Sequence, residues 1–130
     1  MNEASMIGML STTVSFGALL YLACIGELIS EKAGVLNLGV EGMMALGAVT
    51  GFIVALNTEN PWLALLVAMI VTAAFASIHG IFTVVLGAEQ VVSGLSLTFL
   101  GLGLSAFFGK SAVGNPPGAI LSNVDWGPLS

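Results

Sequence analysis

The sequence predicts an all-α, polytopic bundle of about four transmembrane helices, and three observations lead to that fold class. Hydrophobic residues make up 57% of the 130 residues, and the mean hydropathy is +1.07. Only 7% of the residues are charged, whereas about a quarter are charged in an ordinary soluble domain. The apolar runs are continuous and lack the period-two alternation of a membrane barrel, which favours helices.

Charge and cysteine usage exclude several classes of function. The chain has two lysines, no arginine and a net charge of −5, so it has almost nothing with which to neutralise nucleic-acid phosphates. Cys24 is the single cysteine and permits neither an internal disulfide nor a four-cysteine metal site. The first residues lack the basic stretch of a cleaved signal peptide. We therefore expect no nucleic-acid partner, no bound metal and a permanent first span in membrane lipid.

The first two predicted spans are residues 6–26 and 35–56. The first carries no charge and matches the roughly 20 residues that cross a bilayer. Residues 27–32 are predicted to be a charged turn. The second span is interrupted by Glu41, and residues 33–42 contain three glycines, an asparagine and that glutamate. Each glycine costs a helix about 1 kcal/mol relative to alanine, so this composition predicts a break near the start of the second span.

The third and fourth predicted spans are residues 62–86 and 91–108, which completes a transmembrane region over 1–108. A polar turn precedes the third span, with Pro61 suited to a first helical turn and Trp62 to the membrane interface. Residues 109–130 are rich in Asn, Pro and Gly and are predicted to be an external polar loop. Small residues at helical spacing predict close helix packing at Gly47, Gly51, Gly80, Gly94 and Gly101.

Two ionisable residues lie inside predicted spans, where each costs a few kcal/mol or more. Glu41 and His79 are both roughly 9–10 Å from the same membrane surface at the helical rise. If the second and third spans pack together, the two side chains can form a hydrogen bond or an ion pair. The alternative is that both residues have purely structural roles. Glu41 can be neutral or interfacial, and His79 can simply bond a nearby carbonyl.

Further polar side chains lie near the same membrane surface. Asn37 shares a helix face with Glu41, and Gln90 and Thr98 follow one stripe of the fourth span. Intramembrane threonines commonly bond the backbone of their own helix, which is the alternative for Thr98. No hydrolase, protease or phosphate-loop motif is present, so we expect no enzyme active site. The candidate substrate path or gate comprises Asn37, Glu41, His79, Gln90, Ser93 and Thr98.

Residues 26–44 (GELISEKAGVLNLGVEGMM) resemble the signature region of bacterial ABC-importer permeases for nucleosides and simple sugars. These permeases belong with the ribose and branched-chain amino acid permeases. The turn at 60–63 (NPWL) and the block at 90–98 (QVVSGLSLT) are also similar to this family, and the resemblance covers about residues 15–110. One departure is Glu89, where the family usually has asparagine.

The resemblance implies a multi-pass subunit of the bacterial inner membrane that moves nucleosides or simple sugars. It implies three partners: a second permease subunit, a cytoplasmic ATPase subunit and an extracytoplasmic substrate-binding protein. ATP is expected on the ATPase and no cofactor on this chain. The turn at 27–32 would be cytoplasmic and the residues after Gly109 external. Because family members are longer, we expect this chain to be an N-terminal half, cut in an external loop and unable to transport alone.

Two rival hypotheses come from other classes of protein. A stand-alone, four-span, proton-coupled transporter acting as a dimer fits the chain length and the membrane glutamate, although the first span of known small exporters carries that glutamate. A membrane scaffold would use its spans only for packing, and it predicts that Glu41 and His79 can be replaced together by apolar residues without loss. For the importer, we expect Glu41→Gln to impair uptake more than assembly.

Overall fold

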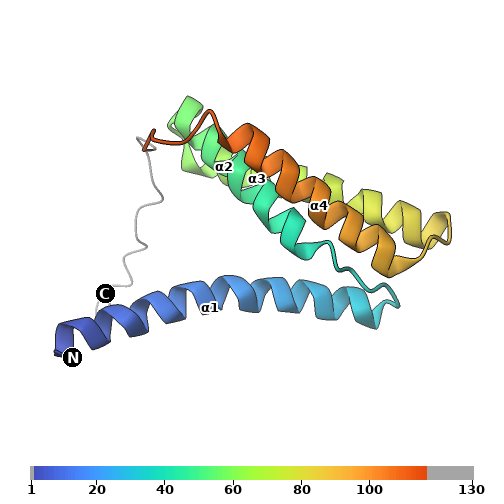
Figure 1. Cartoon of the computed structure of the whole chain (residues 1–130), viewed down its shortest axis with the longest axis horizontal. Helices are drawn as coiled ribbons and strands as arrows, with labels where there is room; N and C mark the ends of the chain where they lie inside the picture. Colours follow the sequence, from blue (N-terminus) through green and yellow to red (C-terminus); the bar gives the residue numbers. More distant parts are fainter. Residues whose placement is uncertain (1, 117–130) are drawn as a thin grey trace.

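The structure is a computed structural model that describes residues 2–116, and this part of the chain is helical without strands (Figure 1). Its helices are α1 (Glu3–Lys32), α2 (Val40–Thr58), α3 (Pro61–Gly80) with a π-helical extension η1 (Ile81–Val85), and α4 (Gln90–Gly109). Four helical segments are long and apolar enough to cross a membrane. The predicted all-α fold with about four spans is confirmed. Of the predicted external loop at 109–130, residues 117–130 lie outside the part of the chain that the structure describes.

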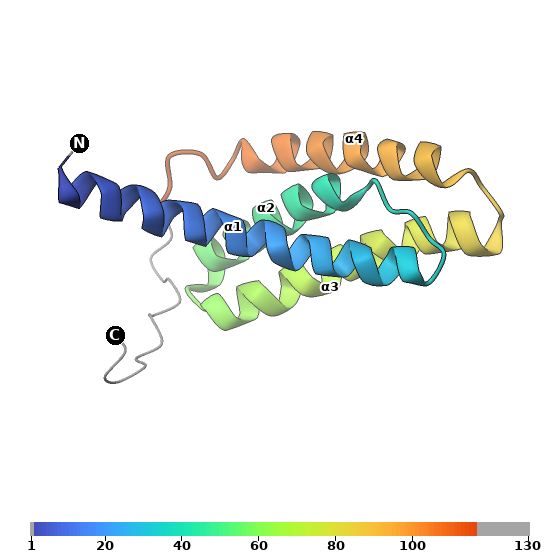
Figure 2. The ribbon, with the colours of Figure 1, turned by 90° about the horizontal axis from the view of Figure 1, so that it is seen from below.

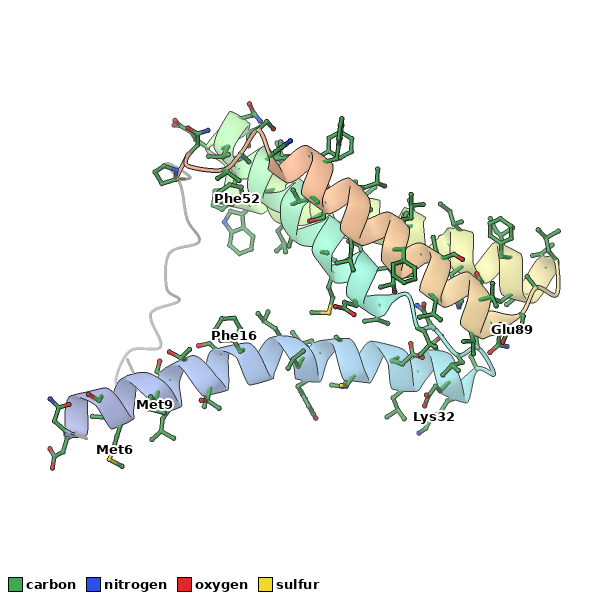
Figure 3. The ribbon with its side chains drawn as sticks, in the orientation of Figure 1. Met6, Met9, Phe16, Lys32, Phe52 and Glu89 are labelled. Atoms are coloured by element: carbon green, nitrogen blue, oxygen red, sulfur yellow. The ribbon has the colours of Figure 1, made fainter. Side chains whose placement is uncertain are left out.

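Helices α2, α3 and α4 form a packed unit, and α1 runs beside it (Figures 1 and 2). Met43 and Leu46 of α2, Phe75 of α3 and Leu97 of α4 form the buried core. None of the apolar span of α1 is buried, and Met6 and Phe16 stand exposed along it (Figure 3). In a membrane, exposed apolar side chains of this kind face lipid or other helices.

Helix α1 ends later than the sequence indicated. Residues 27–32 are its last turns and not a separate charged turn, so that prediction is wrong. Glutamate and lysine are good helix formers, and Lys32 in the last turn complements the negative end of the helix dipole. The chain leaves the helix at Ala33 and Gly34, where Gly34 has a φ of +88°. Glycine adopts this left-handed conformation at little cost.

The starts of α3 and α4 have side-chain caps. The Asn60 side chain accepts hydrogen bonds from the backbone N–H groups of Trp62 and Leu63, and Pro61 occupies the first turn of α3 as predicted. The Glu89 carboxylate accepts from the N–H groups at 91 and 92 and so caps α4. Glu89 therefore has a local structural role, and asparagine, the family's usual residue here, is itself a preferred N-cap residue.

Helices α2 and α4 cross at two glycines. A Cβ on Gly101 would lie 2.7 Å from Gly42 Cα, and one on Gly42 would lie 2.6 Å from Thr98 Cα, so neither position has room for a side chain. Gly47 lies against Thr72 and Gly51 against Ala68 on α3. Gly94 lies against the backbone of Leu38, whereas no atom lies within 4 Å of a Cβ on Gly80. Of the glycines predicted to pack, Gly80 thus has no neighbouring atom where a Cβ would lie, and Gly94 contacts the residues before α2 in place of a helix.

Candidate functional site

The non-helical residues 33–39, which we call the break, lie between α1 and α2. Residues 35–37 are partly buried and Gly39 is buried. A backbone that leaves helical geometry inside a membrane must find its hydrogen-bond partners within the protein. Residues 35–39 of the predicted second span are not helical, because α2 begins only at Val40. The polar side chains around this segment explain how its backbone groups are satisfied.

Gln90, the first residue of α4, holds the break with both ends of its amide. Its Oε1 accepts from Leu36 N–H at 2.7 Å, and its Nε2 donates to Gly34 O at 3.1 Å. This two-point contact satisfies one donor and one acceptor of the break, as a neighbouring β-strand would do. Gln90 thus connects the start of α4 to the start of α2 across 56 residues of sequence.

His79 of α3 is 2% exposed and also bonds the break. Its Nε2 lies 3.2 Å from Leu36 O, and its Nδ1 lies 3.0 Å from Ser93 Oγ of α4. Because a carbonyl only accepts, Nε2 must carry the hydrogen. In a neutral ring Nδ1 then accepts from the Ser93 hydroxyl. His79 therefore joins α3, α4 and the break in one chain of hydrogen bonds.

The expected contact between His79 and Glu41 is not formed in the described structure. Both ring nitrogens of His79 are used by Leu36 and Ser93. Glu41 is exposed, because α2 begins only at Val40 and Glu41 therefore lies in its first turn. A carboxylate at that place is favoured by the helix dipole and by contact with water or polar head groups.

Thr98 bonds the break and not its own helix. Its Oγ1 donates to Leu38 O at 2.7 Å, so the alternative of a bond within its own helix is wrong for this residue. Thr83 shows the local pattern, because its Oγ1 donates to His79 O, four residues earlier, at 2.8 Å. The difference arises because Thr98 faces the break where Gly94, one turn earlier, has no side chain to keep the two backbones apart.

The structure adds Glu27 to this site, although the sequence analysis did not select it. Glu27 Oε1 accepts from Asn37 N–H at 2.7 Å, while Oε2 is buried without a partner. The Asn37 side chain in turn accepts from Gly39 N–H at 2.9 Å and lies 3.6 Å from Met43 Sδ. The sequence analysis missed Glu27 because it interpreted residues 27–32 as a turn. The signal that could have identified Glu27 is its position directly after an apolar run, where the helix continues.

Two grooves open beside the break, between α1 and the packed helices. A groove of 550 Å³ is lined by residues that include Glu27, Asn37 and Glu41. A second groove of 470 Å³ shares Glu27 and Asn37 and also reaches Thr72 and His79. The predicted polar residues Asn37, Glu41 and His79 therefore each line one or both of these grooves. Gln90, Ser93 and Thr98 contact the break or His79 from α4.

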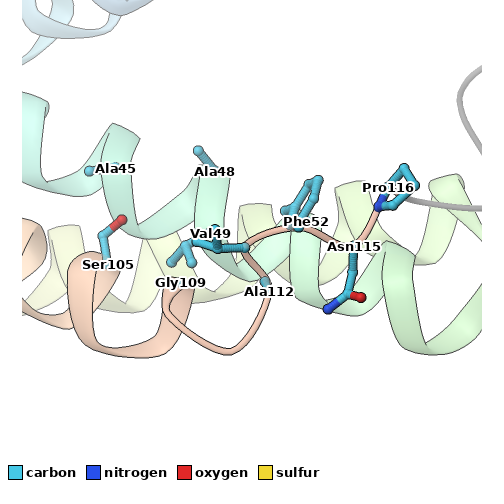
Figure 4. Close-up of a pocket in the computed structure, with 11 residues that line it drawn as sticks. Ala45, Ala48, Val49, Phe52, Ser105, Gly109, Ala112, Asn115 and Pro116 are labelled. Atoms are coloured by element: carbon cyan, nitrogen blue, oxygen red, sulfur yellow. The ribbon is translucent and has the colours of Figure 1, made fainter.

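A further cavity of 760 Å³ lies between α2 and α4 at the opposite end of these helices (Figure 4). Its lining includes Val49, Phe52, Ser105 and Asn115, and it is mostly apolar. None of the predicted path or gate residues lines it. Within residues 2–116, no cluster of three His, Cys, Asp or Glu side chains is arranged to hold a metal ion. The break thus remains the site where polar groups converge.

Comparison with known proteins identifies the family. The model of the branched-chain amino acid transport system permease component matches residues 9–120. The chain belongs to this permease family. Permeases are transport components, and membership together with four apolar helices makes this chain a multi-pass protein of the cell's inner, or plasma, membrane. The suggested resemblance is thereby confirmed.

Relatives of this permease chain are named as transporters of sugars and nucleosides. The chain is 50% identical over 106 residues to a putative glucose ABC transporter permease protein of Haloferax volcanii, a match over 82% of this chain and 32% of the relative. It is 37% identical over 108 residues to the guanosine ABC transporter permease protein NupQ of Bacillus subtilis, with coverages of 78% and 34%. The chain thus spans about a third of the length of these curated relatives. No solved structure matches the permease chain significantly.

Proposed function

We propose that this chain acts in the permease subunit of an ATP-driven importer for nucleosides or simple sugars. The observation that carries the proposal is its similarity, over most of its own length, to permeases named for glucose and guanosine. ATP is bound and hydrolysed on a separate cytoplasmic ATPase subunit. A second permease subunit completes the membrane path, and an extracytoplasmic substrate-binding protein delivers the ligand. The relatives give no support to the proton-coupled dimer.

Within this importer, the break and its polar contacts form the gate at the cytoplasmic end of the substrate path. Asn37, Gln90, Ser93, Thr98 and His79 make the hydrogen bonds that hold the break, and Glu41 borders the adjoining groove. Interrupted helices in membrane transporters accompany substrate paths, because their backbone must line protein or water. Alternating access would then move the break relative to α3 and α4.

The decisive experiment measures uptake by the complete transporter in proteoliposomes. Radiolabelled guanosine and glucose are supplied with the binding protein, and ATP is enclosed on the ATPase side. Uptake of one of them is expected to require ATP and to be lost when the phosphate-binding lysine of the ATPase is replaced. It should continue when a protonophore collapses the proton gradient. Uptake that needs the proton gradient and proceeds without the ATPase would instead support the proton-coupled dimer.

The role of Glu41 is tested in the same assay. Glu41→Gln is expected to lower uptake about tenfold, the factor that ~1.4 kcal/mol represents, while the amount of assembled transporter stays unchanged. Glu59→Gln is the matched control, because Glu59 lies at the other end of α2 and is also exposed. Normal uptake by Glu41→Gln would remove Glu41 from the gate and leave the assignment of the importer intact.

A further inference from the structure

Helix α1 is joined to the rest of the described chain by few contacts. None of its apolar span is buried, and its hydroxyl side chains at 12, 13 and 15 bond carbonyls of α1 itself. Ser30 Oγ donates to Val35 O within the adjoining turn. Among residues 2–116, the side chain of Glu27 makes the α1 hydrogen bond with the most distant partner in sequence. Its Oε1 accepts from Asn37 N–H at 2.7 Å.

Asn37 is a fixed point, because both neighbouring carbonyls are bonded by other helices. His79 of α3 donates to Leu36 O, and Thr98 of α4 donates to Leu38 O. Between Glu27 and this fixed point the chain turns at Gly34, whose φ is +88°. Such a turn favours a glycine. No residue in the apolar span of α1 is buried in the described structure, so no close packing sets the angle of this helix. The hydrogen bond between Glu27 and Asn37 is therefore well placed to set the angle of α1.

We propose that Glu27 is a positioning residue that sets the angle of α1 against the break and, through it, the width of the groove between α1 and α2. Glu27 lines both grooves at this place. One oxygen holds Asn37, and the other is buried without a donor, so the carboxylate is only half satisfied. Rehydration of the carboxylate offsets the loss of the bond when α1 swings away. The hydrogen bond from Asn37 N–H to Glu27 thus fixes the orientation of α1 and can also break when α1 moves.

Cross-linking across the groove tests the position of α1 without any substrate. Native Cys24 and Met44→Cys line the same groove of 550 Å³, and the complete transporter, with its other cysteines replaced, is treated in membrane vesicles with a short bifunctional thiol reagent. Glu27→Ala is expected to lower the cross-linking yield about fivefold. The variant loses a charge-assisted hydrogen bond, so α1 can swing away from α2. Glu31→Ala is the matched control, since Glu31 is exposed, lines the same groove and lies one turn later on α1.

Conservative variants separate positioning from general damage. Glu27→Gln keeps an oxygen for Asn37 N–H and should restore the yield to within about twofold of the wild type. Glu27→Asp shortens the side chain, loses its reach and should behave as Glu27→Ala. The inference is overturned if Glu27→Ala and Glu31→Ala give equal yields. If Glu27→Ala fails to enter the membrane, Glu27→Asp takes its place, and a wild-type yield from Glu27→Asp overturns the inference.

An uptake measurement adds the functional consequence, and only this readout rests on the proposed function. Glu27→Ala should lower the maximal uptake rate about tenfold with an unchanged KM, because Glu27 moves a helix and does not hold the ligand. Glu31→Ala should transport normally. A raised KM with an unchanged maximal rate would overturn the positioning role. If the wild type takes up neither nucleosides nor sugars, the proposed function fails, while the cross-linking result still decides the role of Glu27.

Discussion

At the scale of single residues, Leu36 explains the arrangement of the site. Its N–H is bonded by Gln90 and its carbonyl by His79, so both of its backbone polar groups are satisfied by side chains from other helices. A helix would have satisfied these groups locally. A buried group without a partner costs about 1–3 kcal/mol, so the break depends on a few distant side chains. His79 is the central one, because it also binds Ser93.

The coupling between His79 and Ser93 can be measured with a double-mutant cycle. Ser93→Ala alone should destabilise the protein, since His79 Nδ1 then loses its partner, whereas Ser93→Ala added to His79→Leu should have little effect. We expect a coupling of about 0.5–3 kcal/mol, read from thermal unfolding in detergent. Ser96→Ala is the control, because its hydroxyl is exposed and bonds Val92 O within α4. Additive losses for His79 and Ser93 would contradict the proposed hydrogen bond.

At the scale of the helices, close contact between α2 and α4 brings the start of α4 to the break. The two helices approach at Gly42 and Gly101, and the same face of α4 carries Gly94 and Thr98 toward the break. Without an appreciable hydrophobic driving force between helices in lipid, such contacts depend on small residues and interhelical hydrogen bonds. The glycines and the polar contacts therefore act together, and a change at the crossing should reach the break.

Substitution of Gly101 tests this dependence. Gly101→Ala should lower stability by about 1–3 kcal/mol, because its Cβ would overlap the backbone of Gly42 and push α2 and α4 apart. Gly103→Ala is the matched control on the same helix, since no atom lies within 4 Å of its Cβ. Thermal unfolding of both purified variants in detergent provides the comparison. Equal unfolding temperatures would show that the helices do not cross at Gly101.

The four helices could be predicted from the sequence because long apolar runs directly encode membrane spans. The break could be predicted because glycines and polar residues gather before Val40. The partners of His79 could not, since depth along two helices does not define which faces meet. The end of α1 was placed too early, because charged residues were taken to end the span although they form helix readily. That error also concealed Glu27.

At the scale of the whole molecule, the helices alternate in direction. The end of α1 and the connection between η1 and α4 lie at one end of the packed helices, and the turn from α2 to α3 lies at the other (Figure 1). A membrane protein with this order exposes Lys32 and Glu89 on one side and Glu59 on the other. The family resemblance predicts that the side of Lys32 is cytoplasmic.

Cysteine labelling checks this topology. In a Cys24→Ser background of the full-length transporter, Glu59→Cys should react with a membrane-impermeant maleimide in intact cells. Lys32→Cys and Glu89→Cys should react only after the membrane is permeabilised, because the family resemblance predicts that this end of the helices faces the cytoplasm. Labelled and unlabelled fractions are compared on gels. Reaction of Lys32→Cys and Glu59→Cys from the same side would contradict a membrane-spanning α2.

The distant partners of the break also bear on how the protein is made. The Leu36 carbonyl has no partner until His79 is synthesised 43 residues later. The Gly34 carbonyl has none until Gln90 is synthesised 56 residues later. At about 5–20 residues per second, that delay is on the order of seconds. During this interval lipid offers the break no hydrogen-bond partners. The start of α2 must therefore remain hydrated at the bilayer surface or shielded by the insertion machinery until α3 and α4 have emerged from the ribosome.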